Sequence, residues 1–286
     1  MQNLSCAPSA VAINTATLGH ILDGHGAGWS PEQVIDACAA RGFAGIAFWT
    51  RELNGRAVEI GERTRSAGLR VTGLCRPPYL VGPNAPADQA ESLKGLLETI
   101  DVAAELKAES LTVVVGGVIP ESRSIVGSLN AVADIVARAA DHAASGNVRL
   151  ALEPLHPVYA GDRSCLVTVR DAVDMCNRIG HSHVGLAVDV YHVWWDLTLA
   201  EQLQRLPSDK IFGFHICDWL AETRDILLDR GMMGDGIADI RGLRKIVENA
   251  GYSGPSEVEV FSAGNWWLRD PDEVLDTIVE RVRTVF

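Results

Sequence analysis

Strand-like runs alternate with helix-like segments eight times along this chain, and the alternation limits the fold more than any other feature. The strand-like runs are short and mostly apolar, as expected for strands that are buried on both faces of a parallel sheet. We expect strands at residues 11–17, 45–49, 69–75, 110–115, 148–152, 184–189, 211–215 and 256–261. We expect helices at residues 30–41, 55–67, 88–107, 124–144, 168–179, 199–206, 240–250 and 271–285.

Strict alternation of strands and helices implies a parallel sheet, and eight such units close into a (β/α)8 TIM barrel. We therefore expect an α/β fold with a single domain that spans residues 1–286. The alternative is a doubly wound open sheet. It is disfavoured because no Gly-x-Gly-x-x-Gly follows the first strand and no P-loop occurs.

The composition restricts the classes of partner and compartment. Lys and Arg number 25 against 37 Asp and Glu, a net charge of −12, whereas binding to nucleic acid requires basic side chains that neutralise phosphates. No apolar stretch approaches membrane-spanning length, and residues 1–10 lack the features of a secretion signal. The six scattered cysteines are typical of reduced core thiols. We expect a cytoplasmic protein that binds neither nucleic acid nor membranes.

Four polar side chains stand at the ends of the last four predicted strands: Glu153, Asp189, His215 and Glu259. In a barrel, the carboxyl ends of all strands meet at one face, where reactive groups gather. Carboxylates this close together repel one another unless a cation holds them. Oxygen-rich ligation with one imidazole suits Mn²⁺, Mg²⁺ or Co²⁺, and Zn²⁺ is less favoured because only one His and no thiolate takes part.

Each of these residues also has a purely structural interpretation. Asp189 or Glu153 would then cap the following helix, and His215 would be a satisfied core histidine. Glu257 and Glu259 lie two residues apart on one strand and so face the same side. Because only the residue nearer the carboxyl end can reach the mouth, Glu259 is the predicted ligand and Glu257 a structural acid of the barrel interior.

Several motifs in the second half of the chain resemble those of the xylose-isomerase-like TIM barrels. This group contains sugar isomerases and epimerases and is related to type-IV apurinic endonucleases. The motifs are Leu150-Ala-Leu-Glu153-Pro-Leu-His156-Pro, Asp189-x-x-His192, His215-x-x-Asp218, Gly234-Asp-Gly236 and Gly251-Tyr-Ser-Gly-Pro-Ser-Glu-Val-Glu259.

The resemblance implies that one divalent ion is ligated by the four strand-end residues, and Mn²⁺ is the ion we expect. It implies that Glu153 and Glu259 also act as acid and base, and that His156 and His192 contact the substrate. Trp49, Asp218 and Arg224 are further substrate-contact predictions. The sugar 3-epimerases carry an Arg six residues after the seventh-strand His, where this chain has Ala221, and Arg224 is the nearest substitute.

The expected activity is isomerisation or epimerisation of a keto-sugar or related polyol, through enediolate proton transfer between Glu153 and Glu259. A lyase or dehydratase acting on an inosose or a 3-oxo-glycoside would use the same site, and a non-catalytic sugar-binding barrel is a third alternative. The extra metal ligands of the endonucleases could not be placed, which disfavours DNA repair.

Three further features bear on the substrate and on assembly. The basic residues near the mouth, including Arg76 and Arg163, look scattered, which favours an unphosphorylated carbohydrate. Six tryptophans near strand ends suit either sugar faces or a dimer interface, so a homodimer or homotetramer stays open. The long loop at residues 220–239 is either a lid or a surface excursion.

Overall fold

Local capping signals set the helix boundaries in the computed structural model, which describes residues 6–286. The first long helix, α1 (Pro31–Arg41), begins with a capping box in which the Ser30 hydroxyl accepts from the Gln33 N–H and the Gln33 side chain accepts from the Ser30 N–H. It ends at Gly42, whose φ of 71° is the left-handed conformation that terminates helices. These boundaries agree with the helix expected at residues 30–41.

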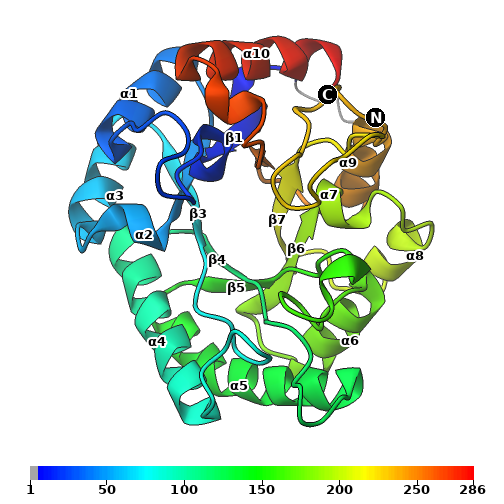
Figure 1. Cartoon of the computed structure of the whole chain (residues 1–286). Coiled ribbons are helices and arrows are strands. Elements are labelled where there is room, and N and C mark those ends of the chain that lie inside the picture. The colour runs from blue at the N-terminus through cyan, green and yellow to red at the C-terminus, as the bar shows by residue number, and fades with distance from the viewer. Residues whose placement is uncertain (1–5) are drawn as a thin grey trace.

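Eight parallel strands form a closed barrel in which each strand pairs with its neighbours in sequence and β1 pairs with β8 (Figure 1). The predicted TIM-barrel fold is therefore confirmed. The strands are β1 (Val11–Asn14), β2 (Gly45–Trp49), β3 (Arg70–Cys75), β4 (Ser110–Val113), β5 (Arg149–Leu152), β6 (Val184–Asp189), β7 (Ile211–Ile216) and β8 (Ser256–Val258).

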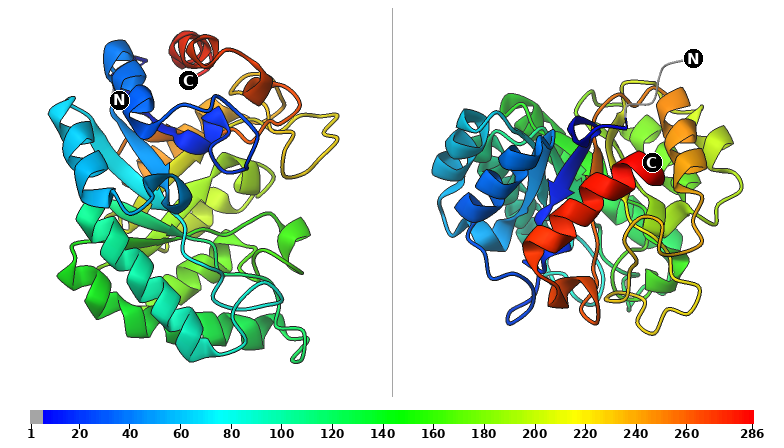
Figure 2. Two further views of the ribbon diagram at one scale, coloured as in Figure 1. Left: turned by 60° about the vertical axis from the view of Figure 1, so that its left-hand side comes forward. Right: turned by 90° about the horizontal axis from the view of Figure 1, so that it is seen from above.

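The helices form a ring around the barrel, and α10 completes the ring beside α1 (Figures 1 and 2). Arg41 of α1 joins these two helices through ion pairs with Asp272 and Asp276. The remaining helices are α2 (Thr50–Leu53), α3 (Ala57–Ser66), α4 (Gln89–Leu106), α5 (Ile125–Ser145), α6 (Val169–Ile179), α7 (Val190–Val193), α8 (Leu199–Leu203), α9 (Ile240–Asn249) and α10 (Pro271–Thr284). Short 3₁₀ turns lie at Pro8–Ala10 (η1), Thr15–Leu18 (η2), Pro157–Tyr159 (η3) and Trp266–Leu268 (η4).

The main apolar core lies between the barrel and its helices. Outward-facing strand residues such as Ile46 and Phe214 pack there with helix residues such as Ile100 and Val136, and all four are almost fully buried. The barrel interior is different, because polar and small side chains occupy much of it. This contrast places charged groups inside the barrel and leaves the apolar packing outside it.

Three strands end earlier than expected, and the first shows why. The predicted strand at residues 11–17 ends at Asn14, because the Asn14 side chain accepts from the N–H of Ala16 and the chain turns into η2. β4 and β8 likewise end at Val113 and Val258. Side-chain-to-backbone hydrogen bonds of this kind compete with strand pairing.

Two expectations about compartment meet the structure only in part. Cys38, Cys75, Cys165, Cys176 and Cys217 are buried thiols, as predicted, whereas Cys6 is exposed and does not lie in the core. Among the described residues, no helix is long and apolar enough to cross a membrane. Residues 1–5 of the N-terminal stretch that was predicted to carry no secretion signal lie outside the described residues.

Candidate metal centre and cavity

The four strand-end residues are held at one face of the barrel by the strand ladder. His215 of β7 is in register with Asp189 of β6. Glu153 and Glu259 follow β5 and β8, and their N–H groups donate to Val113 and Ile216 and so continue the pairing with the neighbouring strands. The backbone therefore fixes where each of these side chains starts.

Their side chains converge as the sequence predicts. One ligand atom from each of Glu153, Asp189, His215 and Glu259 lies within 4.8 Å of the other three, and all four residues are buried. Three carboxylates and one imidazole are a suitable donor set for a hard or borderline divalent cation. The cluster could therefore hold one metal ion.

The charges in this cluster are poorly balanced by the protein alone. Burial raises the pKa of Glu259 to about 8, and the nearby carboxylates of Glu153 and Asp189 add to this effect. Burial opposes the charged form of His215, but the carboxylates of Glu257 and Glu153 raise the pKa of His215 well above its usual value. A divalent cation would relieve the same repulsion, so the electrostatics agree with the donor set.

Arg230 is a site residue that the sequence analysis missed. It lies in the loop after β7 and is 3% exposed, with Nη1 3.1 Å from Asp189 Oδ2 and 3.3 Å from Glu259 Oε2. Its guanidinium lies between the rings of Tyr191 and Phe261, at 4.3 and 4.2 Å from their centroids. Its position in a long loop, far from any strand end, gave no signal in the sequence.

A second layer of polar groups lies deeper in the barrel beneath the cluster. The side-chain amide of Asn14 donates to both Glu257 (2.8 Å) and Glu259 (2.9 Å), so one residue links the two glutamates. Glu257 also accepts from Thr72 (3.0 Å), and its carboxylate is 3.7 Å from His215 Nε2. Glu257 is thus the interior acid that its position in the strand predicts, whereas Asn14 and Thr72 were not predicted.

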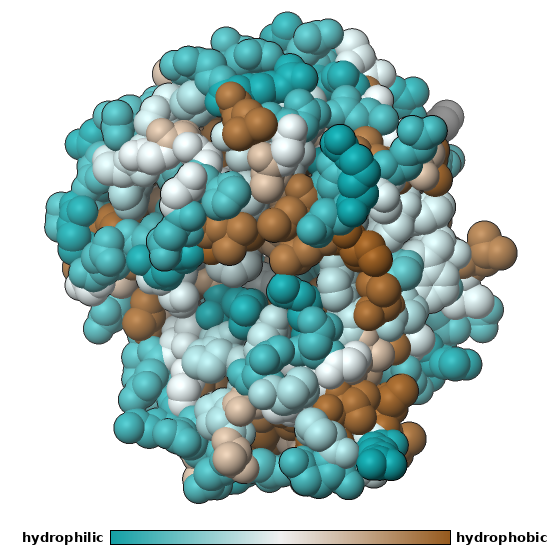
Figure 3. All heavy atoms as spheres, in the orientation of Figure 1, coloured by the Kyte–Doolittle hydropathy of each residue, from teal (hydrophilic) through white to brown (hydrophobic). Residues whose placement is uncertain are grey.

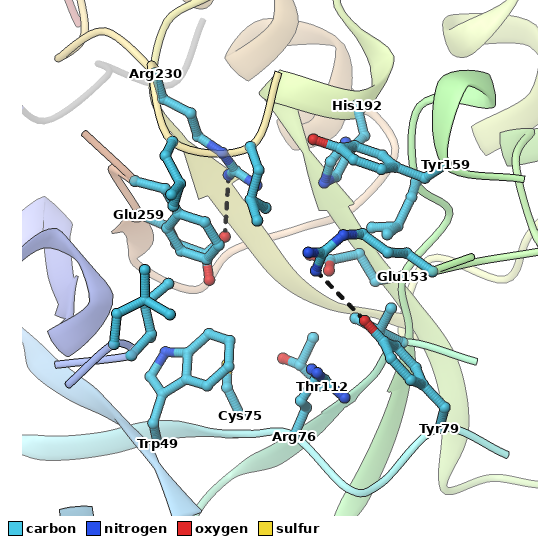
Figure 4. A pocket seen from close by; sticks show the side chains of 18 residues that line it. Trp49, Cys75, Arg76, Tyr79, Thr112, Glu153, Tyr159, His192, Arg230 and Glu259 are labelled. Carbon is cyan, nitrogen blue, oxygen red and sulfur yellow. Dashed lines mark hydrogen bonds and ion pairs between the residues drawn. The ribbon is translucent and has the colours of Figure 1, made fainter. Parts of the chain in front are cut away.

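A cavity of about 180 Å³ opens above the cluster at the carboxyl end of the barrel. In the space-filling view of this face, apolar side chains border the central hollow (Figure 3). Glu153 and Glu259 reach the cavity from different sides, with Arg76 and Tyr79 across from Arg230 (Figure 4). Other lining residues come from several strand ends and loops, among them Trp49, Thr112, Tyr159, Arg163, His192, Leu227 and Leu228.

Two of the predicted substrate contacts, Trp49 and His192, line this cavity. The indole N–H of Trp49 donates to Asn14. His192 Nδ1 accepts from the His156 N–H, which leaves the proton on Nε2, 3.5 Å from Asp189. Burial lowers the pKa of His192 to about 3, so its ring is neutral. The neutral ring presents its Nε2 proton to the Asp189 carboxylate.

The structure does not bring the other three predicted contacts to the cavity. His156 stacks on Trp219, with 5.2 Å between the ring centroids. Asp218 accepts from the N–H groups of four residues in the following loop: Trp219, Gly234, Gly236 and Ala238. The side chain of Arg224 is 79% exposed and pairs with Asp229.

The long loop after β7 is anchored to the rest of the molecule at several points, so it differs from a freely moving lid. Asp229 forms a bridge with Ser262 outside the loop, and the Arg230 N–H donates to the Phe261 carbonyl. The hydroxyls of Tyr159 and Tyr191 both donate to the Ile226 carbonyl. Leu227, Leu228 and Arg230 of this loop form part of the cavity wall. The loop therefore builds one side of the site.

Comparison with known proteins agrees with this architecture. A segment of 160 residues is 27% identical to an inosose isomerase of Bacillus velezensis and covers 54% of each chain, so the match spans about half of that relative's length. A crystal structure of a protein from Sinorhizobium meliloti 1021 is 41% identical, with a TM-score of 0.88, over 97% of this chain and 98% of the other.

A solved structure of the IolI protein with a bound zinc atom is 20% identical, with a TM-score of 0.78 over 97% of this chain and 99% of the other, and shows the same fold. The family model described as xylose isomerase-like TIM barrel matches residues 35–284. This chain therefore belongs to the xylose isomerase-like TIM barrel family.

Proposed function

We propose that this protein is a divalent-metal-dependent isomerase or epimerase that acts on a keto-sugar or a related polyol. The observation that carries the proposal is the convergence of Glu153, Asp189, His215 and Glu259 on one buried point at the floor of a cavity. Relatives that modify sugars support the same class of activity.

The two glutamates suit a proton transfer because both are ligand candidates that also line the cavity. A bound divalent ion would polarise a ketone and its neighbouring hydroxyl. This would acidify the C–H proton on the carbon that bears the hydroxyl. Glu153 and Glu259 face the cavity from different sides, so one carboxylate can remove that proton and the other can return it.

The neighbouring residues hold these carboxylates in place. Glu153 Oε1 is 2.8 Å from His215 Nδ1, and Glu259 accepts from Asn14 and Arg230. Apolar and aromatic side chains such as Trp49 and Phe261 line part of the cavity beside these carboxylates. The chain thus provides positioned proton acceptors at the wall of an open cavity.

Mn²⁺ is the ion we expect, because oxygen donors dominate the cluster. The IolI structure contains zinc, so Zn²⁺ and Co²⁺ belong in the same test. Since the relative from Bacillus velezensis is an inosose isomerase, inososes belong in the substrate panel with keto-hexoses. Both substrate types carry a ketone beside a hydroxyl.

Incorporation of deuterium from D₂O at the carbon next to the ketone tests the proposal. In D₂O, metal-loaded protein should exchange this proton, so that the product gains one deuterium. In H₂O, the product should have the same mass as the substrate. Glu153→Gln and Glu259→Gln should each lower the exchange rate at least about 100-fold, the low end for acid–base catalysis. The exposed Glu121→Gln is a matched charge control and should exchange normally.

Other outcomes favour the remaining alternatives. A product lighter by one water or by an aglycone would identify a lyase or dehydratase that uses the same cluster. Protein that holds no metal after purification, and neither binds nor responds to added Mn²⁺, would favour a non-catalytic sugar-binding barrel. Unchanged exchange in both glutamate variants would contradict the assignment of the acid and base.

A further inference from the structure

Two arginines from different loops meet at one wall of the cavity, although they looked scattered in the sequence. Arg76 directly follows β3, and Arg163 lies in the loop after β5. Tyr79 joins them: the Arg76 guanidinium lies 4.1 Å from the centre of its ring, and its hydroxyl accepts a long hydrogen bond of 3.5 Å from Arg163 Nη1 (Figure 4). All three residues line the cavity.

These guanidiniums are the positive charges of the cavity that the metal cluster does not use. Arg230 is already paired with Asp189 and Glu259. One divalent ion together with Arg230 balances the three carboxylates of the cluster. The charges of Arg76 and Arg163 then remain in excess within the cavity.

Arg163 forms an ion pair with Asp162, but this pair does not neutralise its charge effectively. Asp162 Oδ2 is 3.8 Å from Arg163 Nε, and its side chain is 58% exposed. An exposed pair at this distance is strongly screened by water and contributes little. Arg76 donates to the carbonyl of Pro77, which is a neutral acceptor.

Tyr79 also fixes the direction of the pair. It is 9% exposed, and its ring supports one guanidinium while its hydroxyl contacts the other. Tyr159 lies on the other side of Arg163, with its ring centre 5.8 Å from the guanidinium carbon. Aromatic supports of this kind lower the entropy cost of holding long side chains in place for a ligand.

We propose that Arg76 and Arg163 form an anion subsite, so that the substrate carries a carboxylate or a phosphate ester at the end remote from its ketone. The planar guanidinium binds both groups through paired N–H donors. This inference rests on the proposed function and narrows it from neutral keto-sugars and inososes to acidic ones. It replaces the expectation of an unphosphorylated neutral substrate with a requirement for negative charge.

Binding of three ketoses that share one head group tests the subsite. D-fructose, D-fructuronate and D-fructose 6-phosphate have the same hydroxyketone and differ at C6, which is neutral, a carboxylate or a phosphate ester. Their affinities for wild-type protein are measured by calorimetry at saturating Mn²⁺. We expect at least one anionic ligand to bind about tenfold or more tightly than fructose. Which of the two binds more tightly identifies the anion.

Variants separate the subsite from general charge effects. Arg76→Gln and Arg163→Gln should each remove most of the preference for the anion, and Arg163→Lys should retain part of it. Arg138→Gln, on an exposed position of α5, changes the net charge equally and should keep the preference. Thermal unfolding of each variant checks that the fold is intact.

The two proposals fail in different ways. A wild-type protein that favours neither anionic ligand over fructose overturns the anion subsite, as does a preference that survives in the Arg76→Gln/Arg163→Gln double variant. Metal-dependent proton exchange on neutral ketoses alone would leave the proposed function standing without the subsite. A preference for the anion without any exchange would support the subsite and contradict the proposed function.

Discussion

Two layers of the barrel interior contain a glutamate from the same strand region, yet they differ in how their charges are satisfied. In the deeper layer, both carboxylate oxygens of Glu257 accept hydrogen bonds, one from Asn14 and one from Thr72. In the layer at the mouth, Glu259 shares Arg230 with Asp189 and faces Glu153 across the same cluster. The carboxylate of the deeper layer therefore has a donor for each oxygen, whereas the three carboxylates at the mouth have too few positive charges around them.

This difference shows how two residues on the same face of one strand acquire different roles. Glu257 is surrounded by neutral donors and by His215, so it stabilises the network without needing a further ligand. Burial and neighbouring carboxylates raise the pKa of Glu259 to about 8, which marks a site that a cation would stabilise. The mouth is therefore the reactive layer, and the deeper layer supports it.

The largest expected effect comes from removing one carboxylate charge, first in the layer at the mouth and then in the deeper layer. Glu259→Gln removes a proposed acid or base and should lower the turnover number by about 100-fold or more. Glu257→Gln keeps both glutamates of the mouth and should lower it by less than about tenfold. Steady-state kinetics at saturating metal measure both. Equal losses in the two variants would remove the distinction between the layers.

Removing the metal should destabilise the mouth and leave the deeper layer intact. A ligand present at 100 times its dissociation constant stabilises a folded protein by about 2.7 kcal/mol. Wild-type protein should therefore melt several degrees lower after chelation, as measured by calorimetry. Glu259→Gln should show a much smaller difference between metal-loaded and chelated protein. An unchanged melting temperature in wild type would argue against a metal centre.

The deeper layer should affect the metal indirectly, through the orientation of His215. The Nε2 atom of His215 is 3.7 Å from Glu257. Carboxylates that contact a metal-ligating histidine in this way typically contribute 10- to 100-fold to metal affinity. We expect Glu257→Gln to weaken Mn²⁺ binding by about tenfold in a competition assay with a fluorescent chelator. Glu121→Gln, at an exposed position, is the control. No change in affinity would mean that Glu257 only fills space.

The smallest effect is expected for Thr72→Val, which deletes one donor to Glu257 and keeps the side-chain shape. Loss of one buried hydrogen bond should lower the free energy of unfolding by about 1–3 kcal/mol. Denaturant titration measures this change. Turnover should stay close to wild type because the mouth keeps all its groups. A large loss of turnover would show that the two layers act as one unit.

Much of the fold was predictable because its signals are local. Caps such as Ser30 and Gln33 and terminators such as Gly42 are readable from neighbouring residues. The four cluster residues were also predictable, because each stands at or near the end of a predicted strand and parallel strands bring such ends together. The exact ends of the strands were harder to predict, as the early turn at Asn14 shows.

Contacts between distant segments decided the rest. Arg230 and Asn14 reach the cluster from a loop and from the first strand, 29 and 245 residues away from Glu259. Arg224 and Asp218 are polar residues that follow the seventh strand closely in sequence, so both were predicted to contact the substrate. In the structure, Arg224 forms an ion pair with Asp229, and Asp218 accepts from the Gly234 N–H, so both side chains bind within the loop after β7. Sequence spacing does not fix the path of such a loop.

The sequence by itself determined the closed barrel and the four residues that converge at its mouth, because strand periodicity fixes both the sheet and the side on which each strand end lies. Only the tertiary structure decided which charges remain unbalanced. That depends on where the loops carry Arg230, Arg76 and Arg163, and electrostatic interactions act through space and not along the chain.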